Sequence, residues 1–210
     1  MAERRPLVVK IGGGLLRAQG LAGLARACAE AAQLARRGPV LVVPGGGPFA
    51  DAVRTLDRQL GLADDVAHAL ALRAMDQLGV LLARLLPDAE LVSGLAAPRA
   101  LAIVQAAPAF ADRPEVPASW SLTSDSLAVL AAAASGAEEA VLLKAVDGVL
   151  ANWPSDRPAI AALTAAELAS LHARGEGLAV DAYLPEAVRR TGVAVVVRAP
   201  GGRGTRITRD

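Results

Sequence analysis

Short runs of apolar, β-favouring residues alternate along this chain with longer segments whose leucines and alanines recur at helical spacing. Strands are expected at residues 7–11, 40–43, 91–92, 101–104, 140–144, 193–197 and 205–208. Helices are expected at residues 21–37, 49–60, 64–86, 123–134 and 181–191, and a capping box, Thr164-x-x-Glu167, opens one more. Such alternation is typical of a mostly parallel sheet covered on both faces, so the sequence predicts an α/β fold.

No internal repeat or linker divides the 210 residues, which favours a single domain over residues 1–210. Two proline-rich stretches, residues 106–119 and 152–158, are expected to be loops over a site or surface excursions. Although 53% of the residues are hydrophobic, no stretch of about 18 apolar residues lacks a charge or a helix breaker, so we expect no membrane span. The apolar run at the N-terminus is too short for a signal peptide, and we expect a cytoplasmic protein.

The charge balance argues against a nucleic-acid partner. The net charge is +1, from 22 basic and 21 acidic residues, and aromatic residues make up only 2% of the chain. The single cysteine, Cys28, excludes an intrachain disulfide, and no histidine–cysteine cluster has the spacing of metal ligands. The high apolar content favours a homo-oligomer, and the expected partner is a small molecule.

Three expected strands end in glycine-rich or polar segments. Gly12, Gly13 and Gly14 follow the first strand, Gly45, Gly46 and Gly47 follow the second, and Lys144 with Asp147 follows the strand at 140–144. In open α/β sheets, ligands bind at the carboxyl ends of the strands. Consecutive glycines leave backbone N–H groups free to approach an anion, and a following helix adds its positive end. Two such loops favour a phosphate site.

The use of lysine is the second signal. Only Lys10 and Lys144 are lysines, and the other twenty basic residues are arginines. Both lysines lie at the predicted site, where a compact ammonium group suits a crowded phosphate better than a planar guanidinium. Neither lysine is preceded by glycine, which excludes a Walker A loop. A dinucleotide fingerprint, Gly45-x-Gly47-x-x-Ala50, stays open as a minor alternative, although its acidic partner does not end the next strand.

Asp125 lies at the start of the helix expected at 123–134, between Ser124 and Ser126. Serine, threonine and aspartate are common helix caps, so capping is the structural alternative for this residue. If Thr123 or Ser124 caps the helix, the Asp125 carboxylate is free to orient the lysines. Phosphoryl transfer depends mainly on positioning and charge neutralisation, which such a carboxylate would serve.

Four segments together resemble the signatures of the amino acid kinase family, which includes acetylglutamate, carbamate, uridylate and isopentenyl phosphate kinases. They are VKIGGG at 9–14, PGGG at 44–47, SDSLA at 124–128 and LKAVDGV at 143–149, and the match covers nearly the whole chain. Within the family, residues 74–77 and 119–126 are most similar to the aminomethylfuran phosphate kinases of methanofuran-type coenzyme synthesis. Those enzymes phosphorylate a phosphate monoester to a diphosphate.

The resemblance implies a three-layer αβα sandwich with an eight-stranded, mainly parallel sheet, and ATP with Mg²⁺ on its phosphates. It implies that Lys10 neutralises the transferring phosphoryl group and that Asp125 aligns the lysine. The first glycine loop would contact that group, and the second would hold the acceptor. The nucleotide side would be formed by Lys144, Asp147 and Gly148.

One departure from the family's pattern bears on activity. Many relatives place a second catalytic lysine after a proline near residue 185, but this chain has Pro185-Glu186, with Arg189 and Arg190 nearby. Three hypotheses therefore stay open. The chain is a kinase for a furan phosphate, a kinase of the same fold for another phosphate or carboxylate, or a non-catalytic nucleotide-binding or storage protein.

Recognition of an aminomethyl acceptor would require a carboxylate for the ammonium group, and Asp76 is the candidate for this role. A solvated helix residue is the structural alternative for it. His68 lies two turns earlier on the same expected helix, where a structural or exposed role is the alternative to a functional one. Trp120 could form a wall of the site or pack in the core.

Overall fold

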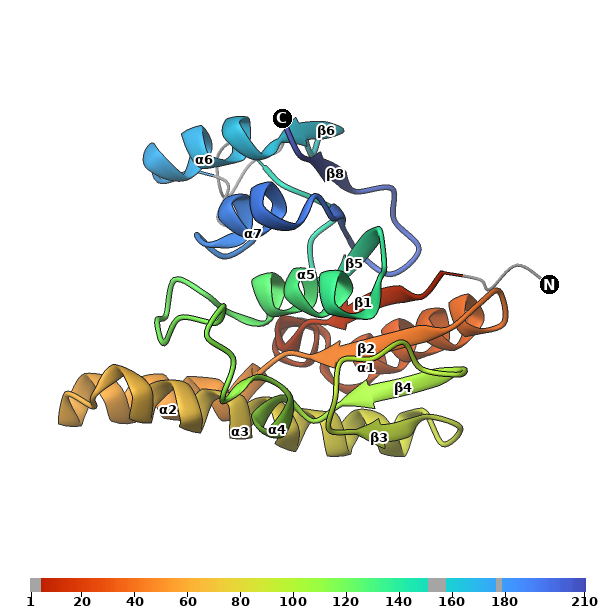
Figure 1. Cartoon of the computed structure of the whole chain (residues 1–210), viewed down its shortest axis with the longest axis horizontal. Coiled ribbons are helices and arrows are strands. Elements are labelled where there is room, and N and C mark those ends of the chain that lie inside the picture. Colours follow the sequence, from red (N-terminus) through yellow and green to blue (C-terminus); the bar gives the residue numbers. More distant parts are fainter. Residues whose placement is uncertain (1–4, 151–157, 177–178) are drawn as a thin grey trace.

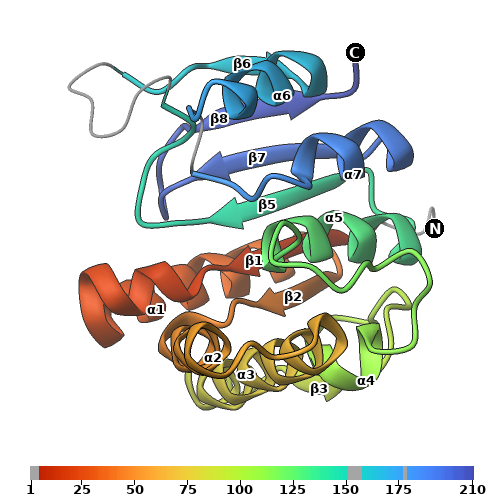
Figure 2. The same ribbon diagram turned by 90° about the vertical axis from the view of Figure 1, so that its left-hand side faces the viewer.

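The computed structural model describes residues 5–150, 158–176 and 179–210 of the chain. In this part of the chain, eight strands form one sheet in the order β3-β4-β2-β1-β5-β7-β8-β6 (Figures 1 and 2). Neighbouring strands are parallel except for the antiparallel pair of β7 and β8. The strands are β1 Leu7–Ile11, β2 Val40–Pro44, β3 Glu90–Val92, β4 Leu101–Val104, β5 Glu139–Leu143, β6 Ala162–Thr164, β7 Ala194–Arg198 and β8 Thr205–Thr208.

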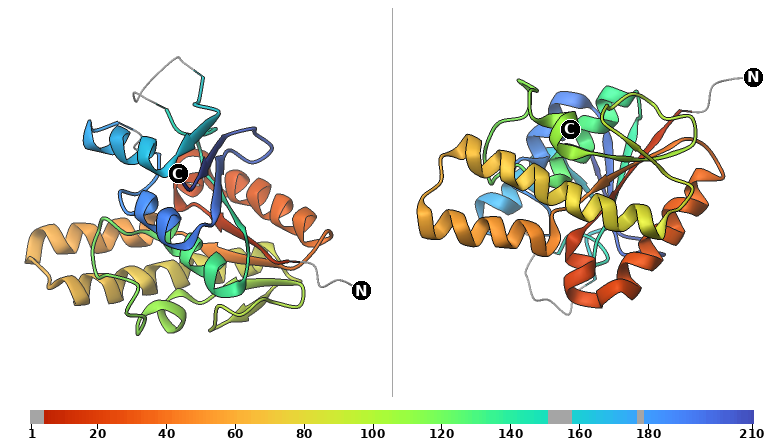
Figure 3. Two further views of the ribbon diagram at one scale, coloured as in Figure 1. Left: turned by 45° about the horizontal axis from the view of Figure 1, so that its top comes forward. Right: turned by 90° about the horizontal axis from the view of Figure 1, so that it is seen from below.

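Helices cover both faces of this sheet (Figure 3). They are α1 Gly13–Ala35, α2 Gly47–Leu60, α3 Asp64–Leu85, α4 Ala106–Phe110, α5 Ser124–Ser135, α6 Ala165–Ala173 and α7 Leu184–Thr191. One core joins buried residues of α1 and the second half of α3 to one sheet face, and the other joins those of α4, α5, α6 and α7 to the opposite face. The α/β prediction and the three-layer arrangement are confirmed.

The alternation of side chains along a strand decides where the two lysines point. Val8 belongs to the core beneath α5, whereas Val9 and Ile11 belong to the opposite core. Lys10, two residues after Val8, therefore points to the α5 face. Leu142 also lies in the core beneath α5, and Lys144 follows it by two residues, just past the end of β5. Both ammonium groups consequently approach α5.

The register of the central strands brings their carboxyl ends to one edge. Ile11 at the end of β1 pairs with Pro44 at the end of β2 and with Leu143 at the end of β5. The segments that follow these three strands are therefore neighbours, although they are far apart in the sequence.

Several sequence-based boundaries differ from the structure. The first helix begins at Gly13 rather than at 21, and Gly20, with φ +60°, separates its two helical stretches. Residues 106–110, expected in a loop, form α4, and the strand β6 was not predicted. The last helix begins at Leu184 rather than at 181. The capping box of α6 is confirmed, and residues 152–157 lie outside the described residues.

Among the described helices, α3 alone has the length and hydropathy of a membrane span, with a mean hydropathy of 1.3 over its most apolar window. Its apolar residues include Leu72, Leu78 and Leu82, which are buried in the two cores of the molecule. These contacts are those of a core helix that packs against a sheet.

Candidate active site

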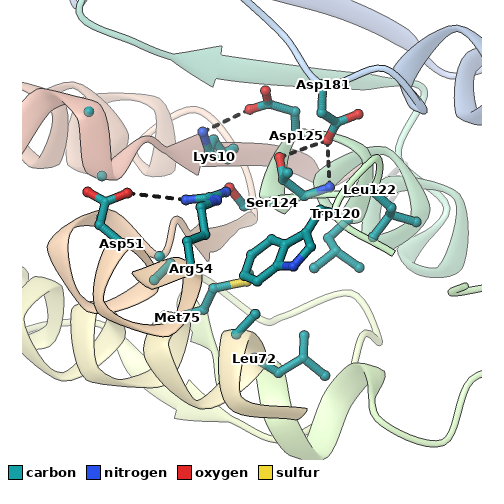
Figure 4. Close-up of a pocket in the computed structure, with 18 of the residues that line it drawn as sticks. Lys10, Asp51, Arg54, Leu72, Met75, Trp120, Leu122, Ser124, Asp125 and Asp181 are labelled. Carbon is teal, nitrogen blue, oxygen red and sulfur yellow. Dashed lines mark hydrogen bonds and ion pairs between the residues drawn. The ribbon is translucent and has the colours of Figure 1, made fainter. Parts of the chain in front are cut away.

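A cavity of about 560 Å³ opens at the carboxyl edge of the central strands. Its inner end is lined by Lys10, Lys144 and Asp125, and its sides are formed by residues of α1, α2, α3 and the segment before α5. Figure 4 shows Lys10 and Asp125 on one side of this cavity, and Trp120, Leu72 and Met75 on the other. The cavity thus has a charged end and an apolar end.

One carboxylate bridges the two lysines. Lys10 Nζ lies 2.8 Å from Asp125 Oδ1, and Lys144 Nζ lies 2.6 Å from Asp125 Oδ2. The side chains are only 6%, 4% and 16% exposed for Lys10, Asp125 and Lys144. Lys144 also donates a hydrogen bond to the carbonyl oxygen of Ala179. The predicted meeting of both lysines with Asp125 is therefore present in the structure.

The charges of this cluster oppose the effect of burial. Burial alone would raise the pKa of Asp125, but the ammonium groups of Lys10 and Lys144 outweigh it and lower the pKa to about 2. Burial lowers the pKa of Lys10, and the adjacent Asp125 offsets only part of this effect. Asp125 is consequently ionised at neutral pH.

We expect the pKa of Lys10 in the free protein to lie below 10.5, the value of an unperturbed lysine side chain. The value of kcat/KM for ATP should then fall as pH rises through this pKa, because the neutral amine no longer attracts phosphate. The value of kcat should fall only at higher pH, because bound triphosphate favours the ammonium form. With two lysines in the chain, ¹³C NMR of Cε-labelled protein follows the Lys10 titration directly, and a midpoint at or above 10.5 would contradict the expectation.

The two glycine loops pack directly against each other. A Cβ atom on Gly13 would lie 2.1 Å from the Cα atom of Gly47, and one on Gly45 would lie 2.7 Å from the Gly13 nitrogen. Gly47 also has φ +54°, which favours glycine. The close approach of the loops therefore requires glycine at these positions.

Four of the six predicted glycines line the cavity: Gly13, Gly14, Gly46 and Gly47. The other two extend the strand hydrogen bonding, because Gly12 N–H donates to Leu143 O and Gly45 N–H donates to Ile11 O. The helices α1 and α2 begin at Gly13 and Gly47, and among the described residues no side chain caps either start. Two helix N-termini with free N–H groups thus meet at the cavity, which is a favourable place for phosphate.

Asp147 and Gly148, predicted to contact the nucleotide, lie outside the residues that line this cavity. The Asp147 carboxylate accepts hydrogen bonds from the backbone N–H groups of Ala199 and Arg203, after β7. Gly148 has φ +121° and packs against Thr205. Both residues shape the segment between β7 and β8, and a contact of either with nucleotide stays a prediction.

Asp76 does not lie where the sequence-based interpretation placed it. Its carboxylate accepts hydrogen bonds from the backbone N–H groups of Ala106 and Ala107, at the start of α4, and it does not line the cavity. Free N–H groups at a helix start attract a carboxylate, which explains this position. The candidate role of Asp76 in binding the acceptor is therefore corrected to a cap for α4.

Other charged residues at the cavity were missed by the sequence analysis. Asp51 of α2 forms ion pairs with Arg17 (2.7 Å) and Arg54 (3.2 Å), and all three line the cavity. In the sequence, Arg17 follows the first glycine loop, and Asp51 and Arg54 follow the second, each within about two helical turns. This spacing could have indicated that they lie near the site. Asp181 also lines the cavity, from the segment before α7.

His68 and Trp120 both line the cavity. The Trp120 indole is held from two sides, because its Nε1–H donates to Asp57 Oδ2 (2.7 Å) and the Arg54 guanidinium lies 4.7 Å from the ring centre. Burial lowers the pKa of His68, so its imidazole is neutral at physiological pH.

The comparisons with known proteins agree with this geometry. The model of the amino acid kinase family matches residues 5–198 of the chain. The chain belongs to the amino acid kinase family. A curated relative, [5-(aminomethyl)furan-3-yl]methyl phosphate kinase of Methanocaldococcus jannaschii, is 26% identical over 123 residues, which are 56% of this chain and 57% of the relative. The matched segment thus spans little more than half of that relative.

Solved structures of the family share the whole fold. Uridylate kinase from Archaeoglobus fulgidus superposes with a TM-score of 0.73 at 21% identity, over 96% of this chain and 99% of that one. UMP kinase from Bacillus anthracis superposes with a TM-score of 0.73 at 15% identity, over 99% of this chain and 97% of that one. The family and fold resemblance drawn from the four signature segments is therefore confirmed.

Kinases of this family use ATP, typically with Mg²⁺. In the described part of the chain, no group of three or more histidine, cysteine, aspartate or glutamate side chains could hold a metal ion. The lysines and helix-start N–H groups at the charged end bind phosphate rather than metal. This chemistry fits a Mg²⁺ ion held mainly by the ATP phosphates, where it would neutralise part of their charge.

Proposed function

We propose that this protein transfers the γ-phosphoryl group of ATP to a phosphate monoester, [5-(aminomethyl)furan-3-yl]methyl phosphate or a close analogue, and so makes a diphosphate. One observation carries the proposal: the ammonium groups of buried Lys10 and partly buried Lys144 share one carboxylate beside two glycine loops that start helices. Such an arrangement holds positive charge where a transferring phosphoryl group passes.

In the proposed reaction, an anionic oxygen of the acceptor phosphate attacks the γ-phosphorus, and the bond to the bridging oxygen of ADP breaks. The acceptor oxygen is already deprotonated at neutral pH, so the step needs no general base. Lys10 stabilises the charge on the equatorial oxygens, and Lys144 does so from the nucleotide side. Asp125 holds both ammonium groups and takes no proton, because its pKa is about 2.

The apolar end of the cavity supports a flat acceptor. Trp120, Leu72, Met75 and Leu122 form this end (Figure 4). An aromatic ring that stacks against an indole gains more than buried area alone provides. A furan ring would fit this wall, with its phosphate directed to Gly46 and Gly47.

The remaining polar groups of this end suggest how the acceptor is oriented. Arg17 and Arg54 carry two positive charges against the single negative charge of Asp51, which leaves a net positive charge for the acceptor phosphate. Asp64 and His68 of α3 line the same cavity. They replace Asp76 as candidates for binding the ammonium group of the acceptor.

The experiment is a turnover assay with Mg-ATP and five acceptors, in which ADP and product are measured by mass spectrometry. The acceptors are the aminomethylfuran methyl phosphate, isopentenyl phosphate, UMP, acetylglutamate and carbamate. We expect a diphosphate from the furan phosphate, formed at least about a hundredfold more slowly by the Lys10→Ala variant. Turnover of another acceptor alone would overturn the proposed substrate, and ATP binding without any product would favour the non-catalytic hypothesis.

A Trp120→Leu variant tests the acceptor wall against a Trp120→Phe control. The leucine variant should raise KM for the furan phosphate by roughly tenfold, because base-like rings stacked on an indole typically gain 1–3 kcal/mol. The phenylalanine variant should stay closer to wild type, and KM for ATP should change little in both. Equal losses in both variants would contradict stacking.

Glu186, which stands where many relatives have a lysine, has a half-exposed side chain that pairs with Arg189, and it does not line the cavity. We infer that Lys144 supplies the second ammonium group. A Glu186→Lys variant should therefore show kcat within about twofold of wild type, as surface changes usually do. Initial-rate measurements check this, and a gain of tenfold or more would show that a lysine was missing.

We also propose that the protein forms a homo-oligomer and works in the cytoplasm, where its ATP is supplied. Three apolar side chains are exposed near the turn between α2 and α3: Leu56, Leu60 and Val66. A patch of this kind is a common feature of subunit interfaces. Light scattering on the purified protein, compared with a Leu60→Lys variant, measures the oligomeric state.

A further inference from the structure

Asp181 is a partly buried carboxylate that the proposed reaction does not use. It lies in the segment before α7, and its side chain reaches the first turn of α5, more than fifty residues earlier in the chain. Its Oδ2 atom accepts hydrogen bonds from the N–H (2.8 Å) and hydroxyl (2.8 Å) of Thr123 and from the N–H of Ser126 (3.0 Å). Its Oδ1 atom accepts the Ser126 hydroxyl (2.5 Å). Figure 4 shows Asp181 beside Asp125 at the charged end of the cavity.

The two residues that donate these four hydrogen bonds, Thr123 and Ser126, lie on either side of Asp125 in the sequence. Thr123 precedes α5 but its own side chain does not cap the helix, so Asp181 supplies the cap from a distant segment. A carboxylate is also favoured at the positive end of a helix. Because residues 123 and 126 are both held, the backbone that carries Asp125 has a fixed direction.

The same segment also holds Lys144. The carbonyl oxygen of Ala179, two residues before Asp181, accepts a hydrogen bond from Lys144 Nζ. Tyr183 N–H, two residues after Asp181, donates to Ser121 O (3.0 Å) and joins the segment to the loop before α5. Residues 179–183 thus bond directly to Lys144 and to the residues on both sides of Asp125.

We propose that Asp181 is a positioning residue for phosphoryl transfer: by capping α5 it aims the Asp125 carboxylate between Lys10 and Lys144. Misplaced reacting groups slow an enzyme steeply, since a shift of about 1 Å can cost roughly a hundredfold in rate. The role follows from the hydrogen bonds, and it applies to whichever acceptor the enzyme uses.

The charges agree with this role. With Asp181 ionised, its carboxylate adds a second negative charge near the ion-paired Lys10, Lys144 and Asp125, and this charge opposes the lowering of the Lys10 pKa by burial. Burial raises the pKa of Asp181, and the nearby charge of Asp125 adds to this effect, while the hydrogen bonds from Ser126 and Thr123 oppose it.

Two substitutions separate the cap from the charge. In Asp181→Asn, the amide oxygen can take the place of Oδ2 and the NH₂ group can donate to the Ser126 hydroxyl, so the cap persists without the charge. In Asp181→Ala, both are lost. Thr164→Ala is the matched control, because it removes the side-chain cap of α6, which is remote from the cavity.

The rate assay uses saturating Mg-ATP and an acceptor that wild type turns over. Asp181→Ala should lower kcat by about a hundredfold. Its KM for ATP should stay within threefold of the wild-type value. Asp181→Asn should keep most of the activity, and Thr164→Ala should match wild type even if it is less stable. A kcat for Asp181→Ala within threefold of the Thr164→Ala control would overturn the proposal, as would an Asp181→Asn loss as large as that of alanine.

A second measurement does not depend on any acceptor. The chain has two lysines, so protein labelled at lysine Nζ and Cε gives one pair of NMR signals for each. Asp181→Ala should shift or broaden both pairs, and Thr164→Ala should leave them in place. Unchanged lysine signals in folded Asp181→Ala would overturn the proposal, even if no acceptor in the panel were phosphorylated. If only the furan phosphate fails as an acceptor, the proposed substrate is wrong but the positioning role of Asp181 is unaffected.

Discussion

An Asp125→Ala variant is expected to lose about 3–5 kcal/mol of folding free energy together with most of its activity. The substitution leaves the ammonium groups of Lys10 and Lys144 facing each other in a site where both are largely buried. An unpaired buried charge is far more costly than an exposed one. Chemical denaturation followed by circular dichroism measures the loss.

The pH dependence gives this prediction a second test. Because the pKa of Asp125 is lowered to about 2 in the folded state, below its ordinary value of 3.8, its contribution to stability is complete above pH 3.8. The contribution is lost as pH falls toward 2. The difference in stability between wild type and Asp125→Ala should therefore be constant near neutral pH and shrink in acid.

A control for the charge argument combines two substitutions. Lys10→Ala in the Asp125→Ala background removes one of the two unpaired ammonium groups, and it should recover part of the lost stability. If Asp125→Ala costs less than about 1 kcal/mol, the ion-pair cluster is not the buried unit described above.

Lys10→Ala should lower kcat by about a hundredfold to a thousandfold, the usual effect of removing one group that stabilises transition-state charge. The stability should change less than in Asp125→Ala, because Asp125 keeps its ion pair with Lys144. KM for ATP should change far less than kcat, since the helix N-termini still bind phosphate. Steady-state kinetics with saturating acceptor separate the two constants.

A Lys10→Arg variant is the charge-preserving comparison. Lys10 is surrounded by the glycine loops and the core, and its Nζ lies 3.1 Å from where a Cβ on Gly12 would be. A planar guanidinium is too large for this place, so arginine should restore little of the activity lost in Lys10→Ala. Activity close to wild type with arginine would show that charge alone matters there.

The sequence carried enough information for the centre of the site. Period-two alternation in β1 and β5 decides the face on which Lys10 and Lys144 lie, and the glycine loops mark the strand ends. Because these signals are local, they could be read from the sequence. The same is true of Asp125, whose position at a helix start follows from its neighbours.

Other features depend on contacts between segments that are distant in sequence. Asp76 and Asp181 both cap helices that belong to other parts of the chain, α4 and α5. No local pattern shows which helix start an aspartate will reach, so a solvent-exposed carboxylate and a buried cap look alike in sequence. The start of α1 was missed because glycines at 12–14 disfavour a helix locally, whereas the strand-end packing places them in its first turn.

The confinement of lysine to the buried pair also affects how the protein meets amine-directed chemistry. Acylating reagents and amine cross-linkers react with lysine Nζ atoms and the N-terminal amine, and this chain offers Nζ atoms only at Lys10 and Lys144. Both are ion-paired to Asp125 and little exposed, so acylation should be slow and should inactivate the enzyme in proportion to its extent. Bound Mg-ATP would shield the same atoms, which makes inactivation by acetylating agents a direct measure of nucleotide occupancy.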